Sequence, residues 1–219
     1  MAFRMPKAFK AFLSHFKAEC SSDARLVKKE LESLWPGREA LIDSDNHSDL
    51  HDVRSSECVV LFQSKGVLTR PWCLIELYTA ATSGVPSVCL RILGSFPYDF
   101  ALAADFLAHL DSRLEGASPG ATQLLLDNGV DLVDCAYRLS DAVPKAISVA
   151  FDASSTHDAI NAAILDLAGS IDFAVKSPAK QPALTKDEWL ACRDDQGPAV
   201  AAANEDDREL HRLSPSESA

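Results

Sequence analysis

The segment Cys58-Val59-Val60-Leu61-Phe62 is the feature of this chain that most constrains its fold. Five consecutive apolar residues are typical of a strand buried on both faces, because a strand with one solvated face would alternate apolar and polar residues. Strands of that kind occur in parallel sheets whose two faces are covered by helices. We therefore expect an α/β fold in which Cys58–Phe62 is a central strand.

Shorter apolar segments and amphipathic stretches alternate around this strand. Four further strands are predicted at residues 8–14, 40–42, 85–92 and 146–151. Helices are predicted over residues 21–35, from Pro71 to Gly84, and from His157 to about Ile171, since proline favours the first turn of a helix and glycine its end. Neighbouring parallel strands need crossover connections, which helices supply. The pattern predicts a flavodoxin-like, doubly wound, parallel five-stranded sheet with helices on both faces.

The 219 residues divide into one domain and a tail. Residues 1–175 contain every predicted strand, together with a helical insertion at about residues 96–139. Residues 176–219 are acidic and rich in proline and alanine, with few large apolar groups. Such a segment buries too little apolar area to offset the entropy of ordering, so we expect it to be disordered.

The composition restricts the classes of partner and the cellular compartment that we expect for this protein. The formal net charge of −11 disfavours nucleic acid, because a phosphate-backbone binder needs a clustered basic surface. No stretch approaches the roughly 18 uncharged apolar residues of a membrane span, and charges interrupt any secretory signal before Ala11. Six cysteines without a Cys-x-x-Cys pair are typical of reduced thiols, so we expect a cytoplasmic location. A mitochondrial transit peptide at residues 1–18, which hold no acid, is the weaker alternative.

Several familiar sites are absent from the sequence. It contains no Gly-x-Gly-x-x-Gly fingerprint, no Walker phosphate loop and no Gly-x-Ser-x-Gly elbow. His47 and His51 lie four residues apart beside Asp43, Asp45 and Asp49, a spacing that places two imidazoles on one face of a helix. We interpret this segment as a solvated loop and expect no metal site and no bound cofactor.

The strongest motif is Trp72-Cys73-Leu74-Ile75-Glu76-Leu77, which follows the central strand. With that strand and with Gly84–Val88 it resembles the third strand, third helix and fourth strand of TIR (Toll/interleukin-1 receptor) domains. Ala11–His15 is similar to the first-strand box of that family. Leu41–Asp45 is similar to its second strand and the start of its BB loop.

This resemblance covers residues 8–92 well and residues 93–175 only through the closing strand and helix. Many members of the family hydrolyse NAD at the nicotinamide–ribose bond, and the glutamate of this motif is essential for that reaction. The resemblance therefore implies that Glu76 is catalytic and that NAD is a substrate. The chemistry agrees, because a pyridinium leaving group needs no acid while a carboxylate stabilises the oxocarbenium character that develops on the ribose.

Five further residues are candidates for binding NAD. Trp72 is a candidate for stacking on the nicotinamide or adenine ring, although a tryptophan more often packs a helix onto a sheet. His15, Phe16 and Lys17 follow the first strand and are expected to line the pocket, with Lys17 near a phosphate or simply exposed. Asp43 follows the second strand, so it is expected at the same edge of the sheet as the residues that follow the first strand.

Family members act through self-association, or through binding other TIR domains, by way of the BB loop and the second helix. Here few residues separate Asp49 from the central strand, which leaves little room for that helix. Two alternatives to an NAD-cleaving signalling enzyme therefore remain open. One is a non-catalytic TIR adaptor. The other is a nucleoside-processing transferase, which needs a second carboxylate facing Glu76, and Asp43 is the candidate.

Overall fold

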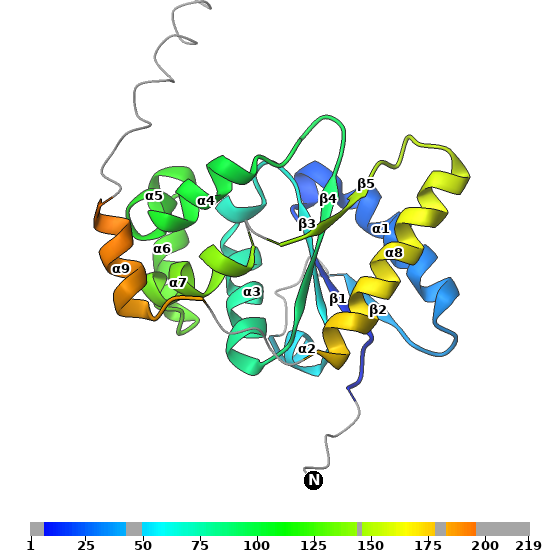
Figure 1. Cartoon of the computed structure of the whole chain (residues 1–219), viewed down its shortest axis with the longest axis horizontal. Helices are drawn as coiled ribbons and strands as arrows, with labels where there is room; N and C mark the ends of the chain where they lie inside the picture. Colours follow the sequence, from blue (N-terminus) through cyan, green and yellow to red (C-terminus); the bar gives the residue numbers. More distant parts are fainter. Residues whose placement is uncertain (1–6, 43–49, 144–145, 178–182, 196–219) are drawn as a thin grey trace, which may run out of the picture. The chain divides into compact units, whose positions relative to one another are not determined.

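The strand predicted to be central is the middle strand of the observed sheet. The computed structural model describes residues 7–42, 50–143, 146–177 and 183–195. Its five strands are all parallel and lie in the order β2-β1-β3-β4-β5 (Figure 1). Their bounds are β1 (Ala11–Ser14), β2 (Ala40–Ile42), β3 (Val59–Gln63), β4 (Ser87–Ile92) and β5 (Ser148–Phe151). The prediction of a flavodoxin-like doubly wound parallel sheet is confirmed.

Burial explains why β3 occupies the centre. Every residue of β3 is buried, and the strand pairs with β1 on one side and β4 on the other. Val60 and Phe62 point into the core beneath the helices of one face, while Leu61 has the opposite orientation because side chains alternate along a strand. A strand of this composition is stable only where both faces are covered, and the fold provides that cover.

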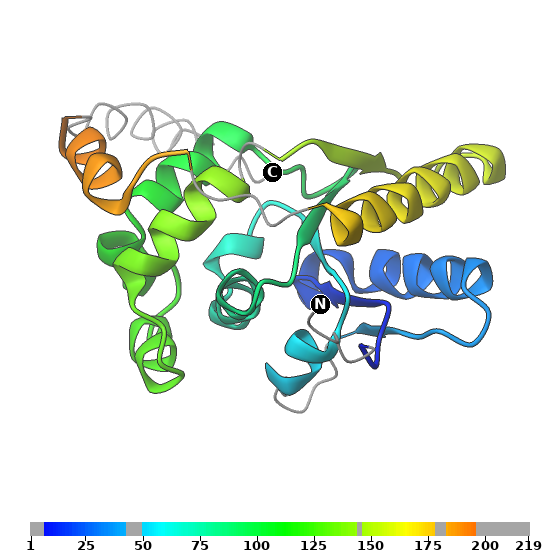
Figure 2. The ribbon, with the colours of Figure 1, turned by 60° about the horizontal axis from the view of Figure 1, so that its bottom comes forward.

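Two long helices cover one face of the sheet. Figures 1 and 2 show α1 (Lys17–Leu34, blue) and α8 (His157–Lys176, yellow) side by side on that face. The predicted start at residue 21 matches the regular part of α1, because the backbone of Cys20 (φ −147°, ψ 31°) is not helical and separates a first turn from the rest of the helix. In that first turn the Phe16 carbonyl accepts hydrogen bonds from the amides of Glu19 and Cys20. Thr156 caps α8 by accepting a hydrogen bond from the amide of Ala159 at 3.3 Å.

The opposite face carries α2 (Leu50–Ser55), the short 3-10 helix η1 (Val67–Thr69) and α3 (Pro71–Ser83). Proline lies in the first turn of α3, and Gly84, with a φ of +66°, ends it in the left-handed conformation that favours glycine. The six residues of α2 make less than two turns, so a second helix forms in the short space before β3.

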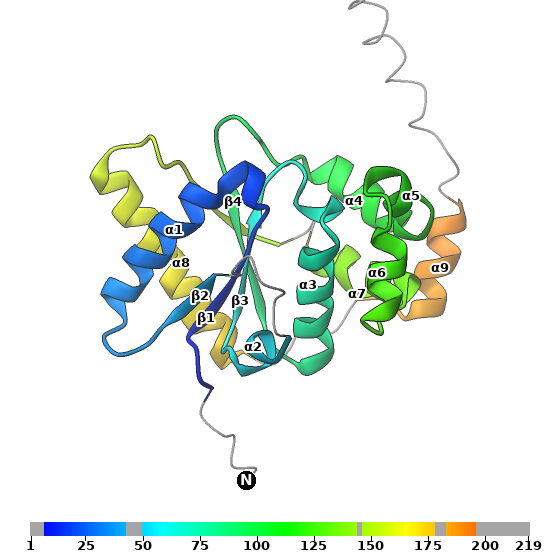
Figure 3. The same cartoon turned by 180° about the vertical axis from the view of Figure 1, so that it is seen from behind.

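A layer of four helices lies outside α3 (Figure 3). They are α4 (Phe100–Ala108), α5 (Leu110–Ala117), α6 (Ala121–Asp127) and α7 (Leu132–Ala142). Asp134 on α7 accepts a hydrogen bond from the Tyr78 hydroxyl of α3 at 2.9 Å and one from Arg138 at 2.7 Å. Because α6 and α7 cover its outer side, α3 is apolar nearly all round.

A second unit comprises residues 184–219, and its described part contains one helix, α9 (Lys186–Asp195). Helix α9 corrects the expectation that residues 176–219 are disordered throughout, as does α8, which extends to Lys176. Thr185 and Glu188 form a reciprocal capping box in which the hydroxyl and amide of Thr185 each donate to the Glu188 carboxylate at 2.8 Å. This capping box starts α9, although the helix has no large apolar face. Among the described residues, no helix combines the length and the apolar character needed to cross a membrane.

All six cysteines are free thiols, and five of them are buried. Burial raises the pKa of Cys20 to about 11. It raises the pKa of Cys58, of Cys89 and of Cys135 to about 12. Because the thiolate is the reactive form, these side chains should be inert in the folded protein, whereas Cys192 on α9 is exposed.

We therefore predict that the native protein reacts rapidly with a chromogenic disulfide reagent at one thiol per chain, and at all six thiols once it is unfolded in denaturant. Replacement of Cys192 by Ser should remove the fast reaction. Two or more fast equivalents in the native protein would contradict the burial of the five core thiols.

Candidate active site at the carboxyl ends of β1 and β3

Buried polar side chains gather at one edge of the sheet. Among the described residues, seven polar or charged side chains are buried, and five of these lie at the carboxyl ends of β1 and β3 or on the second turn of α3. These five are Ser14, His15, Gln63, Ser64 and Glu76. Burying such groups costs free energy unless they are paired. Open parallel sheets bind ligands at this edge, so the cluster is the candidate site.

A short hydrogen bond joins Glu76 to the end of β1. The Glu76 side chain is 1% exposed, and the Ser14 hydroxyl, on the last residue of β1, donates to its Oε2 at 2.5 Å. This length is typical of a hydroxyl bound to a carboxylate. Glu76 also lies in the amino-terminal half of α3, where the helix dipole favours negative charge. The predicted catalytic residue is thus a desolvated carboxylate held at the ligand-binding edge.

The residues that follow β1 reach the start of α3. The Cys73 thiol donates to the His15 carbonyl at 3.5 Å, and the His15 ring is buried with its edge against Phe62, at a centroid distance of 6.1 Å. Phe16 caps α1, and the Arg70 guanidinium lies over its ring at 4.7 Å. These contacts bring the strand-end residues predicted from the sequence beside the motif helix.

The other predicted substrate-binding residues are less enclosed. Lys17 is the first residue of α1 and is half-buried, and Trp72 is half-buried on the first turn of α3. Trp72 is therefore not fully buried between the helix and the sheet, and part of its surface remains exposed. Asp43 lies outside the described residues, as does His47 of the histidine pair.

A contact that the sequence does not reveal joins the segment after β1 to the segment after β3. Both carboxylate oxygens of Glu19 accept from the Gly66 amide, at 2.9 and 3.1 Å. A Cβ atom at Gly66 would lie 2.9 Å from Glu19 Oε1 and 3.2 Å from a ring carbon of Phe16. Glycine is therefore required here for close approach, not for backbone conformation, because its φ of −102° is open to any residue.

Gln63 belongs to the structure of the sheet. Its amide nitrogen donates to the Val143 carbonyl at 3.2 Å, and its oxygen accepts from the Ser148 hydroxyl at 2.5 Å. The nearby phenol of Tyr98 is also enclosed, and burial raises the pKa of its hydroxyl. These groups join the carboxyl end of β3 to the start of β5, so we assign them a structural role.

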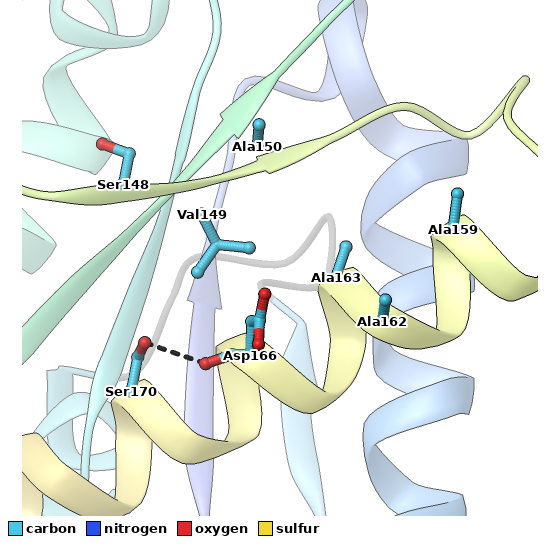
Figure 4. A pocket seen from close by; sticks show the side chains of 8 residues that line it. All are labelled: Ser148, Val149, Ala150, Ala159, Ala162, Ala163, Asp166 and Ser170. Carbon is cyan, nitrogen blue, oxygen red and sulfur yellow. Dashed lines mark hydrogen bonds between the residues drawn. The ribbon is translucent and has the colours of Figure 1, made fainter.

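A shallow depression on the α8 side of the sheet lies away from Glu76 and is not the candidate site. It lies between β5 and α8 and is lined by Ser148, Val149, Ala150, Ala159, Ala162, Ala163, Asp166 and Ser170 (Figure 4). Its walls are small aliphatic and hydroxyl side chains with one carboxylate, and α8 covers the face of the sheet opposite to α3. No three side chains of His, Cys, Asp or Glu in the described ranges are grouped to hold a metal ion.

No model of a known protein family matches this chain, and no curated protein matches it. The TIR resemblance therefore depends on the motif residues of the sequence alone. The structure brings Glu76 close to the predicted residues after β1, and their functional roles stay predictions. Sequence reasoning missed the roles of Ser14, Glu19, Gly66 and Arg70, whose partners lie far away in the sequence and leave no local pattern.

We predict that Gly66→Ala lowers the free energy of unfolding by about 1–3 kcal/mol, since the added methyl group must displace the Glu19 carboxylate or the Phe16 ring. Chemical denaturation measures this change. The control is Gly116→Ala on α5, where a Cβ meets nothing within 4 Å and helix propensity should raise stability by about 0.5–1 kcal/mol. Equal stability of Gly66→Ala and the wild type would show that the close approach of Gly66 to Glu19 and Phe16 does not stabilise the fold.

Proposed function

We propose that this protein is a TIR-type NAD glycohydrolase that releases nicotinamide from NAD and acts in signalling through self-association. The observation that carries the proposal is the buried carboxylate of Glu76, hydrogen-bonded to Ser14 at the carboxyl edge of the sheet within a Trp-Cys-x-x-Glu motif. A cytoplasmic location is part of the proposal and is supported by the six free cysteines.

In the proposed reaction the bond between ribose C1′ and the nicotinamide nitrogen breaks, and its electron pair neutralises the pyridinium. Positive charge then develops on C1′ and the ring oxygen of the ribose. The Glu76 carboxylate stabilises this charge, and a carboxylate that is 1% exposed does so more strongly than one in water, because little solvent screens it. A water oxygen adds to C1′ and its proton leaves to solvent, which completes a hydrolysis.

Aromatic and cationic groups beside Glu76 suit the remainder of NAD. The half-buried Trp72 and Phe16 offer ring faces for a base or for nicotinamide. Lys17, the first residue of α1, and Arg70, which lies over the Phe16 ring, offer positive charge to the diphosphate. In this proposal Glu76 is the catalytic residue, and Ser14 is a positioning residue that acts through it.

The second candidate function is a non-catalytic TIR adaptor. The observation that favours it is the same hydrogen bond, because a buried link between β1 and α3 is also what a purely structural glutamate would make. Glu76 and Ser14 variants separate these two functions.

We predict that Glu76→Gln slows nicotinamide release because it raises the activation free energy by roughly 2.7–4 kcal/mol or more. The protein should stay folded. Apparent NAD affinity should change far less, since the ground-state nicotinamide carries its own charge. The matched control is Glu57→Gln, which removes a carboxylate paired with Lys10 and Arg38 just before β3, at the opposite edge of the sheet. It should reduce stability and leave turnover per folded molecule intact. A Glu76→Gln protein with a lower melting temperature and unchanged turnover would favour the adaptor.

We also predict that Ser14→Ala lowers turnover by about 10- to 100-fold, the range that corresponds to one hydrogen bond to a charged group. Ser56→Ala is the control, since Ser56 is an equally buried serine whose hydroxyl donates to the Asp52 carbonyl at 2.8 Å, away from the site. Both variants should lose some stability. Equal turnover in the two variants would exclude a positioning role for Ser14.

A further inference from the structure

The side chain of Ser177 caps the carboxyl end of α8. Its hydroxyl donates a hydrogen bond to the Phe173 carbonyl at 2.8 Å, and its amide donates to the same carbonyl at 3.0 Å and to the Ala174 carbonyl at 3.3 Å. The last carbonyl groups of a helix have no partner within the helix and carry its negative partial charge. The Ser177 hydroxyl therefore lies at the negative end of the α8 dipole.

The residues around Ser177 form the motif Lys176-Ser177-Pro178-Ala179-Lys180. Protein kinases of the proline-directed class transfer phosphate to a serine that precedes proline, and one group of them also selects a base three residues after the serine. The sequence holds two other Ser-Pro pairs, which begin at Ser118 and Ser214 and have alanine and glutamate at that position. Ser177 is thus the one serine of the chain that meets both requirements.

The backbone at Ser177 suits recognition as an extended segment. Its φ of −84° and ψ of 148° are extended, as a following proline requires. Pro178 and Lys180 lie outside the described residues, and their part in the motif comes from the sequence. The Ser177 side chain is partly exposed and lies at a helix end, where fraying costs little free energy. A kinase therefore needs to open only the last turn of α8 to reach this hydroxyl.

A phosphate on Ser177 opposes the end of α8. Phosphoserine carries a charge of about −1.5 to −2 near pH 7, which is unfavourable beside the negative end of a helix. It also lacks the hydroxyl proton that Ser177 donates to the Phe173 carbonyl. Lys176 offsets little of this charge, because adjacent positions on a helix do not face each other. Phosphorylation should therefore open the last turn.

We propose that Ser177 is a phosphorylation site for a proline-directed protein kinase, and that the phosphate opens the last turn of α8. The γ-phosphoryl group of ATP forms a bond to Ser177 Oγ, its bond to ADP breaks, and the hydroxyl proton passes to the catalytic base of the kinase. Just before this turn, Asp172 pairs with Lys10 at 2.7 Å, so the opening also weakens a link between α8 and the segment before β1. The proposal goes beyond the proposed function and does not depend on it.

Incubation of the full chain with ATP and a proline-directed kinase that selects a base three residues after the serine tests the site. Mass spectrometry should find one phosphate per chain, at Ser177. Ser177→Ala should remove it, whereas Ser118→Ala, at a Ser-Pro pair that also follows a helix, should leave it unchanged. No phosphate above the kinase-free background, or equal incorporation in the Ser177→Ala chain, would overturn the assignment of the site.

Cleavage by chymotrypsin after Phe173 tests the effect on α8, because this side chain is 74% exposed and lies in the last turn. The phosphorylated chain should be cut there about three- to tenfold faster than the unmodified chain. Ser177→Glu and Ser177→Gln match in shape and both lack the hydroxyl, so the Glu variant should be cut about two- to fivefold faster than the Gln variant. High salt should reduce that difference. Equal rates in the two variants, or no faster cleavage of the phosphorylated chain, would overturn the opening of the helix.

Discussion

The burial of β3 on both faces is the constraint on which the rest of the structure depends. A strand whose every residue is buried needs parallel neighbours and helical cover on each side. That requirement fixes α1 and α8 on one face and α3 on the other, and it places every crossover at the ends of the strands. The outer helices α6 and α7 then allow α3 itself to be apolar nearly all round.

The same constraint explains where polar chemistry can exist. Since the middle of the sheet is apolar, buried polar groups collect where β1 and β3 end, and burial there favours pairing between them. Ser14 pairs with Glu76, and Glu19 pairs with the Gly66 amide. Both contacts tie the segment after β1 to the segment after β3. A carboxylate held in this way keeps one orientation, which is what electrostatic stabilisation of a transition state requires.

Local signals were sufficient for much of the fold. The apolar run predicts β3, and Pro71 and Gly84 predict the ends of α3. The extra turn of α1 before the kink at Cys20 could not be predicted, because no side-chain cap marks its start at Phe16. In the site, Glu76 followed from its motif. Its partner Ser14 lies 62 residues away, and the Glu19–Gly66 contact spans 47, so only the folded chain reveals them. The capping box at Thr185 was a usable signal for α9 that the acidic composition concealed.

The most direct test of the central claim is the release of nicotinamide from NAD by concentrated purified protein, followed by chromatography. If Glu76 is a catalytic carboxylate, each chain should release many nicotinamide molecules, at a rate per chain that rises as the protein is concentrated and self-associates. Nicotinamide at the level of spontaneous NAD decay at every protein concentration, from a protein shown to be folded, would contradict the assignment of Glu76 as a catalytic carboxylate.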